Sequence, residues 1–245
     1  MLARRANPAR EHDRIAQQIH NKRVCCFADQ GQIVYFDGVS EQIICDINEI
    51  PMTMNGAALH NVRNALGAVG VASAMRYNAE QIHLGLLHFN SDEKDNPGRL
   101  NSFELSNSAR VIIDFAHNAH SVAAVVDTVE CMPARRKWAL FGSAGDRSDL
   151  EIRAIAEGVC KMKPDHVVIV EVENYLRGRA SGEVSAIMQQ ACLDSGIKQD
   201  KIKLVESPLA GVKHAVSNMQ AEDLGLFLVL SEREAVIDFL RLQSN

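Results

Sequence analysis

Apolar positions follow two different periods along the chain, and the two periods alternate most regularly in its second half. After residue 98, short runs that are nearly all apolar are separated by stretches with apolar residues at helical spacing. The first pattern is typical of strands buried on both faces of a sheet, and the second of helices that cover a sheet. The expected strands lie at 102–105, 110–114, 137–142, 166–171, 202–205 and 225–230. The expected helices lie at about 120–131, 149–162, 182–195, 208–219 and 232–242.

The order of these elements predicts the architecture of residues 96–245. Strands that alternate with helices form a mostly parallel sheet with right-handed crossovers, which is a Rossmann-like α/β fold. We expect the first two strands, 102–105 and 110–114, to form a hairpin-like pair at its start. Ligands on such sheets bind at the carboxyl ends of the strands, so the segments that follow the strands are the places to look for chemistry.

The first 95 residues have a different pattern. The expected elements are strands over 33–36 and 42–47 and helices over 61–75 and 79–87. The turn signal Asp37-Gly38 joins the two strands into a hairpin, and Asn78 is a candidate cap for the second helix. The polar stretch 90–98 ends in a Pro-Gly turn and is the best candidate for a linker. We therefore divide the chain into residues 1–95 and 96–245.

Composition narrows the functional classes. The 245 residues are 47% hydrophobic and 23% charged, which is typical of a globular protein. The formal net charge of −5 gives no support for a nucleic-acid-binding surface, and no apolar run approaches the roughly 20 residues that span a bilayer. The six cysteines form no Cys-x-x-Cys pair, which favours free thiols over disulfides or a zinc site. We expect a cytoplasmic protein with no residues dedicated to a metal.

A carboxylate, an imidazole and an amide follow the strand expected at 110–114. They belong to the segment Asp114-Phe-Ala-His117-Asn118. At the ligand edge of a parallel sheet, these groups suit a ribose or metal-bound waters. Asn118 is equally suited to cap the next helix, and both interpretations stay open.

Two later segments contain arginines close to glycines. Gly142–Asp149 joins a strand to a helix, and its backbone N–H groups suit an anion, although Ser148 or Asp149 also suits a plain helix start. Arg177 and Arg179 flank a glycine after the next strand, where paired guanidinium hydrogen bonds can grip a carboxylate or a phosphate. A solvated loop with incidental charge is the alternative interpretation.

These segments occur together, in this order, in the Mur ligase family, which the chain resembles over roughly residues 24–231. The motifs that carry the resemblance are Ile50–Gly56, His60–Ala68, Pro97–Asn101, Asp114–Asn118, Gly145–Asp149 and Leu176–Glu183. Each motif is weak alone, but their order is specific. The last of them, Leu-Arg-Gly-Arg-Ala-Ser-Gly-Glu, most resembles the cyanophycin synthetase branch. The resemblance implies that residues 1–95 are the tail of a central ATP-binding domain and that 96–245 are the C-terminal domain.

The resemblance also implies an activity. Mur ligases use ATP and Mg²⁺ to phosphorylate an acid, and an amine then displaces the phosphate, which gives an amide, ADP and phosphate. The substrates would be a small acid and an amino acid or peptide. ATP would contact Asn61, Asn64, Arg99 and Asp114, with His117 near the γ-phosphate as the catalytic residue. The incoming amino acid would meet Arg147, Arg153, Asn174, Arg177 and Arg179.

The chain departs from the family pattern at several positions. Phe115 and Ala119 stand in place of the usual tyrosine and proline. Asn174 and Tyr175 stand where cyanophycin synthetases tend to carry acidic residues, which weakens the case for a cationic amine such as arginine. The chain also contains no P-loop, GxxxxGK[ST], so we expect it to be inactive alone.

The expected partner is therefore an N-terminal half or a separate subunit that carries the P-loop. The chain would then be a piece of a longer protein or the product of a split or degenerate gene, and a homo-oligomer is compatible with either. Whether the chain is an enzyme by itself stays open. The alternative is a non-catalytic nucleotide- or peptide-binding scaffold derived from the same domain. A nucleotide-binding oxidoreductase is disfavoured because no expected strand is followed by GxGxxG.

Overall fold

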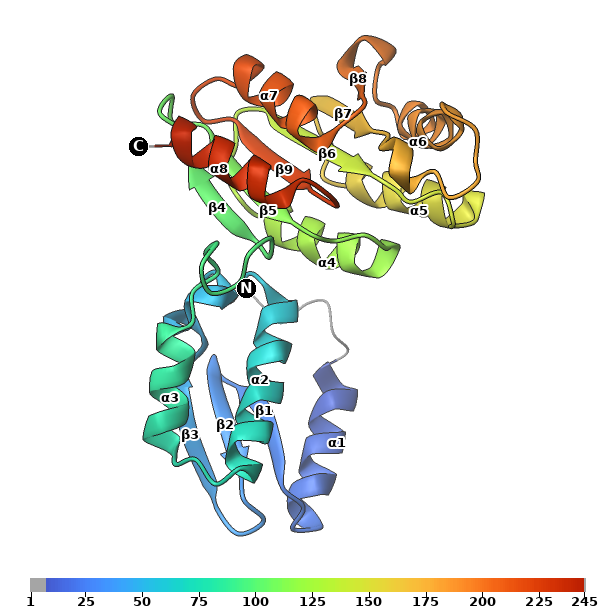
Figure 1. Ribbon diagram of the computed structural model, residues 1–245. Helices are drawn as coiled ribbons and strands as arrows, with labels where there is room; N and C mark the ends of the chain where they lie inside the picture. Colours follow the sequence, from blue (N-terminus) through green and yellow to red (C-terminus); the bar gives the residue numbers. More distant parts are fainter. Residues whose placement is uncertain (1–7, 245) are drawn as a thin grey trace. The chain divides into compact units, whose positions relative to one another are not determined.

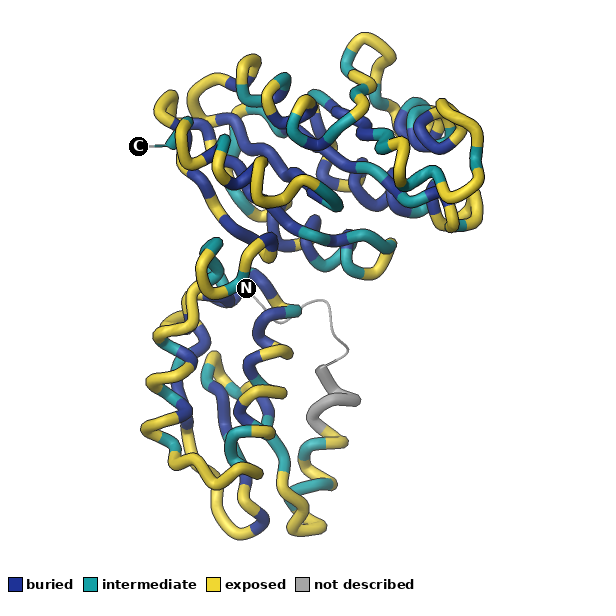
Figure 2. The backbone as a smooth tube through the Cα atoms, viewed as in Figure 1, coloured by how far each residue is buried: buried dark blue, intermediate teal, exposed yellow. Residues whose placement is uncertain are grey.

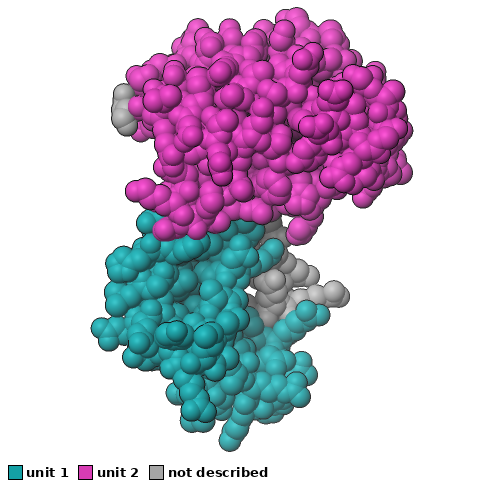
Figure 3. Space-filling view, in the orientation of Figure 1, with its two compact units in different colours: residues 1–90 teal, residues 91–245 magenta. Residues whose placement is uncertain are grey.

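The computed structural model describes residues 8–244. The chain divides into two compact units, residues 1–90 and 91–245, which Figure 3 shows in two colours. Within the described residues, no helix is both long enough and apolar enough to cross a membrane.

The first unit is a three-stranded antiparallel sheet with helices on both faces (Figure 1). Its elements are α1 Pro8–His20, β1 Cys25–Asp29, β2 Gln32–Phe36, β3 Glu41–Asp46, α2 Leu59–Ala74 and α3 Ala79–His88, with 3-10 helices η1 Ile47–Glu49 and η2 Pro51–Thr53. Side chains of one sheet face form an apolar cluster with α2 and α3. Side chains of the other face pack against Ile15 and Ile19 of α1. Both faces of the sheet are therefore covered.

Two local predictions for this unit are confirmed. The Asp37 carboxylate accepts hydrogen bonds from the backbone N–H groups of Val39 and Ser40, both at 2.7 Å, and so fixes the turn of the β2–β3 hairpin. Asn78 caps α3 in a reciprocal pair of hydrogen bonds with Gln81. The pattern of the sequence did not predict α1 or β1.

The second unit contains every strand and helix predicted after residue 98, with ends shifted by at most two residues. Its elements are β4 Asn101–Glu104, β5 Arg110–Asp114, α4 Ala119–Glu130, β6 Lys137–Gly142, α5 Asp149–Cys160, β7 His166–Val170, α6 Glu183–Asp194, β8 Ile202–Val205, α7 Pro208–Asn218, β9 Leu224–Leu228 and α8 Arg233–Gln243. Short 3-10 helices lie at η3 Glu173–Tyr175 and η4 Gln199–Lys201.

The six strands of this unit form one sheet in the order β4-β5-β9-β6-β7-β8. β4 runs antiparallel to β5, which confirms the hairpin-like pair, and the other neighbours are parallel. Helices α4, α5 and α6 cover one face, and α7 and α8 cover the other (Figure 1). Strand β9 lies between β5 and β6 in the sheet. The helices that follow β5 and β6 cover one face, and the helix that follows β9 covers the opposite face. Such a switch opens a crevice at the carboxyl ends of the strands.

Burial explains why the strands of this sheet are so apolar in sequence. All five residues of β9 are buried, and the central strands are dark blue along most of their length in Figure 2. Phe141 and Phe227 are the largest side chains that are fully enclosed. A strand covered by helices on both faces has no polar side, so its sequence shows a continuous apolar run instead of an alternation.

A buried carboxylate joins two strands at the amino edge of the sheet. Asp223, just before β9, accepts hydrogen bonds from Nε and Nη2 of Arg136 at 3.1 and 2.6 Å. It also accepts from Trp138 Nε1 at 3.2 Å and from the Gln220 backbone N–H at 2.9 Å. The Trp138 ring stacks on His166 of β7 with centroids 4.1 Å apart. The charge of Asp223 is therefore satisfied entirely by protein groups, although its side chain is fully buried.

Candidate functional site

The switch between faces of the large sheet produces a small hollow at the carboxyl ends of β6, β7 and β9. Its lining residues are Gly142, Ser143, Val170, Val172, Tyr175, Pro208, Leu228 and Leu230. The segments that follow β5, β6 and β7, in which polar chemistry was predicted, leave this same edge because these strands are parallel. The predicted site residues of this unit therefore lie on segments that leave this edge or on the helices that follow.

Asp114 ends β5 and is almost completely buried. One carboxylate oxygen accepts the Leu100 backbone N–H at 3.0 Å, and the other accepts the Ala116 N–H at 2.7 Å. Burial raises the pKa of Asp114 above its ordinary value, although these donors and the nearby Arg99 act in the opposite direction. Asp114 therefore holds two turns of backbone at the sheet edge, one before β4 and one after β5.

Arg99 and His117 meet at the two turns that Asp114 holds. The exposed Arg99 guanidinium lies 5.3 Å from the centroid of the Phe115 ring, and the His117 ring lies 5.4 Å from the same ring. His117 Nδ1 lies 3.0 Å from the Phe115 carbonyl oxygen. Because a carbonyl oxygen only accepts, this contact requires a proton on Nδ1. The structure thus brings Arg99, Asp114 and His117 together.

Asn118 and Ser148 both act as helix caps. Asn118 begins α4 in a reciprocal capping arrangement with Ser121. Ser148 begins α5 in the same way with Glu151. The capping interpretation of both segments is correct.

Gly142, the last residue of β6, and Gly145, in the loop after it, allow close approach of the end of β7 and of the loop that follows β7. A Cβ atom added to Gly142 would lie 2.5 Å from the Val170 carbonyl oxygen, and one added to Gly145 would lie 2.0 Å from that of Leu176. The Gly145 N–H also donates to the Tyr175 carbonyl at 2.8 Å. Because Gly145 has no side chain, the backbones of the two loops can lie directly against each other.

The two arginines of the loop between β7 and α6 have different surroundings. The Arg179 side chain is only 16% exposed, and it contacts the Gly145 and Arg147 carbonyls and the Asp149 and Glu183 carboxylates at 2.6–2.8 Å. Neighbouring Asp149 and Glu183 raise the pKa of Arg179 further. The Arg177 side chain is 53% exposed, and its guanidinium reaches the Asp146 carboxylate only at 3.5 Å.

Three other predicted amino-acid ligands lie around these loops or on α5. Arg147 is half-buried on the loop before α5, and Asn174 is exposed on η3. Arg153 is different because it pairs with Glu157 at 2.7 Å and with Asp194, at the end of α6, at 2.8 Å. The Arg153 guanidinium therefore joins two helices.

Asn61 and Asn64 lie on α2 of the other unit. Asn61 is buried and donates to the Met52 carbonyl at 2.7 Å, while its own carbonyl accepts from the Asn64 amide at 3.2 Å. Asn64 is exposed. Asn61 thus fixes the turn that leads into α2, and Asn64 presents the remaining amide oxygen to solvent.

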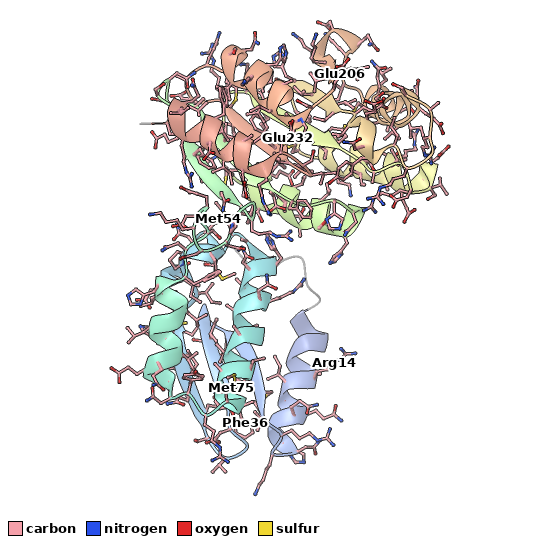
Figure 4. All side chains as sticks on the ribbon, viewed as in Figure 1. Arg14, Phe36, Met54, Met75, Glu206 and Glu232 are labelled. Atoms are coloured by element: carbon pink, nitrogen blue, oxygen red, sulfur yellow. The ribbon has the colours of Figure 1, made fainter. Side chains whose placement is uncertain are left out.

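Several acidic residues at the carboxyl edge of the large sheet were not singled out from the sequence. Asp146 faces Arg177, and Glu206 and Glu232, which Figure 4 labels, follow β8 and β9. Glu171 accepts the backbone N–H groups of Gly182 and Ser185 at the start of α6, at 2.6 and 2.9 Å. Burial raises the pKa of Glu171, but these donors lower it by more, so the net shift is downward. Lone acidic residues in loops have no spacing signal, which is why the sequence pattern did not reveal them.

Comparison with known families and proteins shows that this chain is similar to ligases. The family model described as Mur ligase, glutamate ligase domain, matches residues 98–228. Cyanophycin synthetase of Trichormus variabilis is 28% identical over 212 residues, which are 86% of this chain and 22% of that protein. UDP-N-acetylmuramyl-tripeptide synthetase of Deinococcus radiodurans is 34% identical over 115 residues, which are 45% of this chain and 22% of that protein. The chain spans about a fifth of the length of these curated relatives.

Solved structures show the same fold. FolC of E. coli in complex with ADP superimposes with a TM-score of 0.61 and 17% identity, over 89% of this chain and 46% of that one. A murein peptide ligase from Psychrobacter arcticus gives 0.58 and 19%, over 89% and 42%. The motifs, the sheet order and the matched domain agree, and the chain therefore belongs to the Mur ligase family, whose glutamate ligase domain it carries over residues 98–228.

Proposed function

We propose that the chain is the C-terminal part of an ATP-dependent, ADP-forming ligase that joins an acid to an amino acid, as its similarity to cyanophycin synthetases suggests. The observation that carries the proposal is the position of Arg177. Its guanidinium is half-exposed at the ligand edge of a parallel sheet, and its ion pair with Asp146 is long. An incoming carboxylate can therefore reach it without breaking a short contact.

On the nucleotide side, we assign ATP contacts to Arg99, Asp114, Asn61 and Asn64. Arg99 is exposed and can approach a phosphate. We propose that Asp114 contacts the ribose and Asn61 the adenine; both side chains are buried, and each already makes hydrogen bonds to backbone groups. We assign His117 to the neighbourhood of the γ-phosphate, as the catalytic residue. Arg99 is the one cation among these four residues, so we expect weak ATP binding by the chain alone.

The proposed activity requires a P-loop and Mg²⁺ from a partner segment. The described residues contain no group of three or more His, Cys, Asp or Glu side chains arranged to hold a metal. Mg²⁺ is usually held by one or two carboxylates together with substrate phosphates and water, and we assign those carboxylates to the segment that would carry the P-loop, whether on the same polypeptide or on a separate subunit. The working compartment would be the cytoplasm, where the cysteine side chains stay reduced.

On the amine side, we assign the carboxylate of the incoming amino acid to Arg177. A guanidinium matches a carboxylate with two parallel hydrogen bonds, and Arg147 and Asn174 lie on the adjoining loops to read the rest of the substrate. Arg153 is engaged by Glu157 and Asp194, and we assign it to helix packing.

Replacing Arg177 by lysine should raise the KM for the amino acid at least tenfold and leave the KM for ATP unchanged. Lysine keeps the charge but loses the planar fork, and one charge-assisted hydrogen bond is worth about 1.5–3 kcal/mol. The measurement is steady-state ADP formation by the ligase assembled with its P-loop segment. Arg110→Lys, at the exposed amino end of β5, is the matched control and should change neither constant. If the substitution changes the KM for both substrates equally, or changes neither, Arg177 is a surface residue that does not bind the amino acid.

A further inference from the structure

Arg177 and Arg179 are two residues apart, yet only one of them is available to a ligand. We infer that Arg179 is a positioning residue that clamps the loop carrying Arg177 to the loop after β6, and so sets the geometry of the amine site. This inference rests on the proposed function for its kinetic consequence but not for the clamp itself. The groups that surround the Arg179 guanidinium support the clamp.

The acceptors around Arg179 come from three different elements. Nε donates to the Gly145 carbonyl at 2.8 Å, and Nη2 donates to the Arg147 carbonyl at 2.7 Å, both on the loop after β6. Nη2 also lies 2.7 Å from the Asp149 carboxylate at the start of α5, and Nη1 lies 2.6 Å from Glu183 at the start of α6. A planar guanidinium with five N–H groups can satisfy acceptors in all of these directions at once, which no other side chain can do.

A substrate carboxylate would bind weakly to Arg179. The guanidinium is already paired with two carboxylates, and a third would have to displace Asp149 or Glu183 from contacts shorter than 2.8 Å. Arg177 offers the opposite situation, since its single carboxylate neighbour, Asp146, lies at 3.5 Å. Arg179 therefore holds the loop, and Arg177 is the arginine that can contact the ligand.

The backbone between the two loops strengthens the clamp. The Gly145 N–H donates to the Tyr175 carbonyl at 2.8 Å, and the Arg179 N–H donates to the Leu176 carbonyl at 3.0 Å. Arg177 lies between these two anchors with a left-handed φ of +50°, a conformation that a non-glycine residue adopts at a cost. Contacts on both sides of Arg177 hold it in that conformation, so loss of the Arg179 contacts should release it.

The clamp can be tested on the 245-residue chain by amide hydrogen exchange. Arg179→Lys should speed exchange in both loops, residues 143–148 and 174–181, by roughly tenfold or more, because lysine keeps the charge but cannot bridge the acceptors. Arg153→Lys also removes an arginine that pairs with two carboxylates, and it should leave exchange in these loops unchanged. Arg177→Lys should leave it unchanged as well. Unchanged exchange in Arg179→Lys, or a change in only one loop, would overturn the clamp.

The assembled ligase tests whether the clamp acts through Arg177. Arg179→Lys should raise the KM for the amino acid several-fold and leave the KM for ATP unchanged. In an Arg177→Ala background the same substitution should have almost no further effect on the amino-acid KM, since the group that it positions is absent. Additive effects would show that Arg179 contacts the substrate itself and would overturn the inference. If the assembled wild-type protein forms no ADP, the proposed function fails, and hydrogen exchange still decides the clamp.

Discussion

Replacement of Gly145 by alanine should separate the two loops at the carboxyl edge of the sheet and destabilise the second unit by about 3 kcal/mol. The new Cβ atom would lie 2.0 Å from the Leu176 carbonyl oxygen and 2.8 Å from its carbonyl carbon. Both atoms belong to the backbone, so no change of side-chain rotamer relieves the overlap. The loops must move apart, and the hydrogen bond from the Gly145 N–H to the Tyr175 carbonyl is then lost.

Urea unfolding at neutral pH gives the stability change directly. Gly85→Ala is the control, because Gly85 lies within α3 with no heavy atom within 4 Å of its added Cβ. That substitution should be neutral or stabilising by up to about 1 kcal/mol, as expected for alanine in a helix. A Gly145→Ala protein within about 0.5 kcal/mol of wild type would show that the loops do not lie as close as described.

Replacement of Asp223 by asparagine should cost about 3 kcal/mol at neutral pH. Arg136 Nη2, Trp138 Nε1 and the Gln220 N–H point at Oδ2, and Arg136 Nε points at Oδ1. The amide oxygen of an asparagine would take the Oδ2 position, and its N–H₂ group would then face Arg136 Nε, which also loses its carboxylate. Donors that face donors are left unsatisfied in a buried site, and each costs about 1–3 kcal/mol.

The same residue predicts a pH dependence. Burial raises the pKa of Asp223, but Arg136, Gln220 and Trp138 lower it by more, so the folded-state pKa lies below the ordinary value for aspartate. The ionised carboxylate therefore stabilises the fold above a pH of about 4, and this stabilisation is lost as the pH falls through the folded-state pKa.

Urea unfolding of wild type and Asp223→Asn at pH 7 and pH 3 should thus show a smaller difference at pH 3. Asp200→Asn, at a side chain that is 70% exposed, is the control and should have little effect at either pH. A difference between wild type and Asp223→Asn that does not depend on pH would contradict the prediction.

The fold of the second unit could be predicted because its strands are buried on both faces and its helices on one. Runs such as His166–Val170 and Leu224–Leu228 are apolar for that reason, and the helices between them begin at polar caps that the sequence displays. Helix α1 has few apolar residues, with Ile15 and Ile19 set among charges, so its apolar face was not apparent. Strand β1 is only five residues long and ends in an aspartate.

The candidate site could be predicted only in outline. The place of the segments after β5, β6 and β7 follows from the order of elements, since parallel strands bring their carboxyl ends to one edge. The different roles of Arg177 and Arg179 could not be separated, because they depend on acceptors from residues about 30 positions earlier in the chain. The sequence also predicts that Arg153 contacts the amino acid, because it gives no sign that Arg153 pairs with Asp194 on α6.

We propose that this chain supplies the amine-binding part of an ATP-dependent ligase and that the P-loop is supplied by another segment or subunit. The most direct test is ADP formation by the chain alone and by the chain together with a P-loop segment, with acid and amino acid each present or omitted. We predict sustained, multiple-turnover ADP formation only when the P-loop segment, the acid and the amino acid are all present, and no ADP from the chain alone. ADP formation by the isolated chain, or sustained ADP turnover that does not depend on the amino acid, would contradict this proposal.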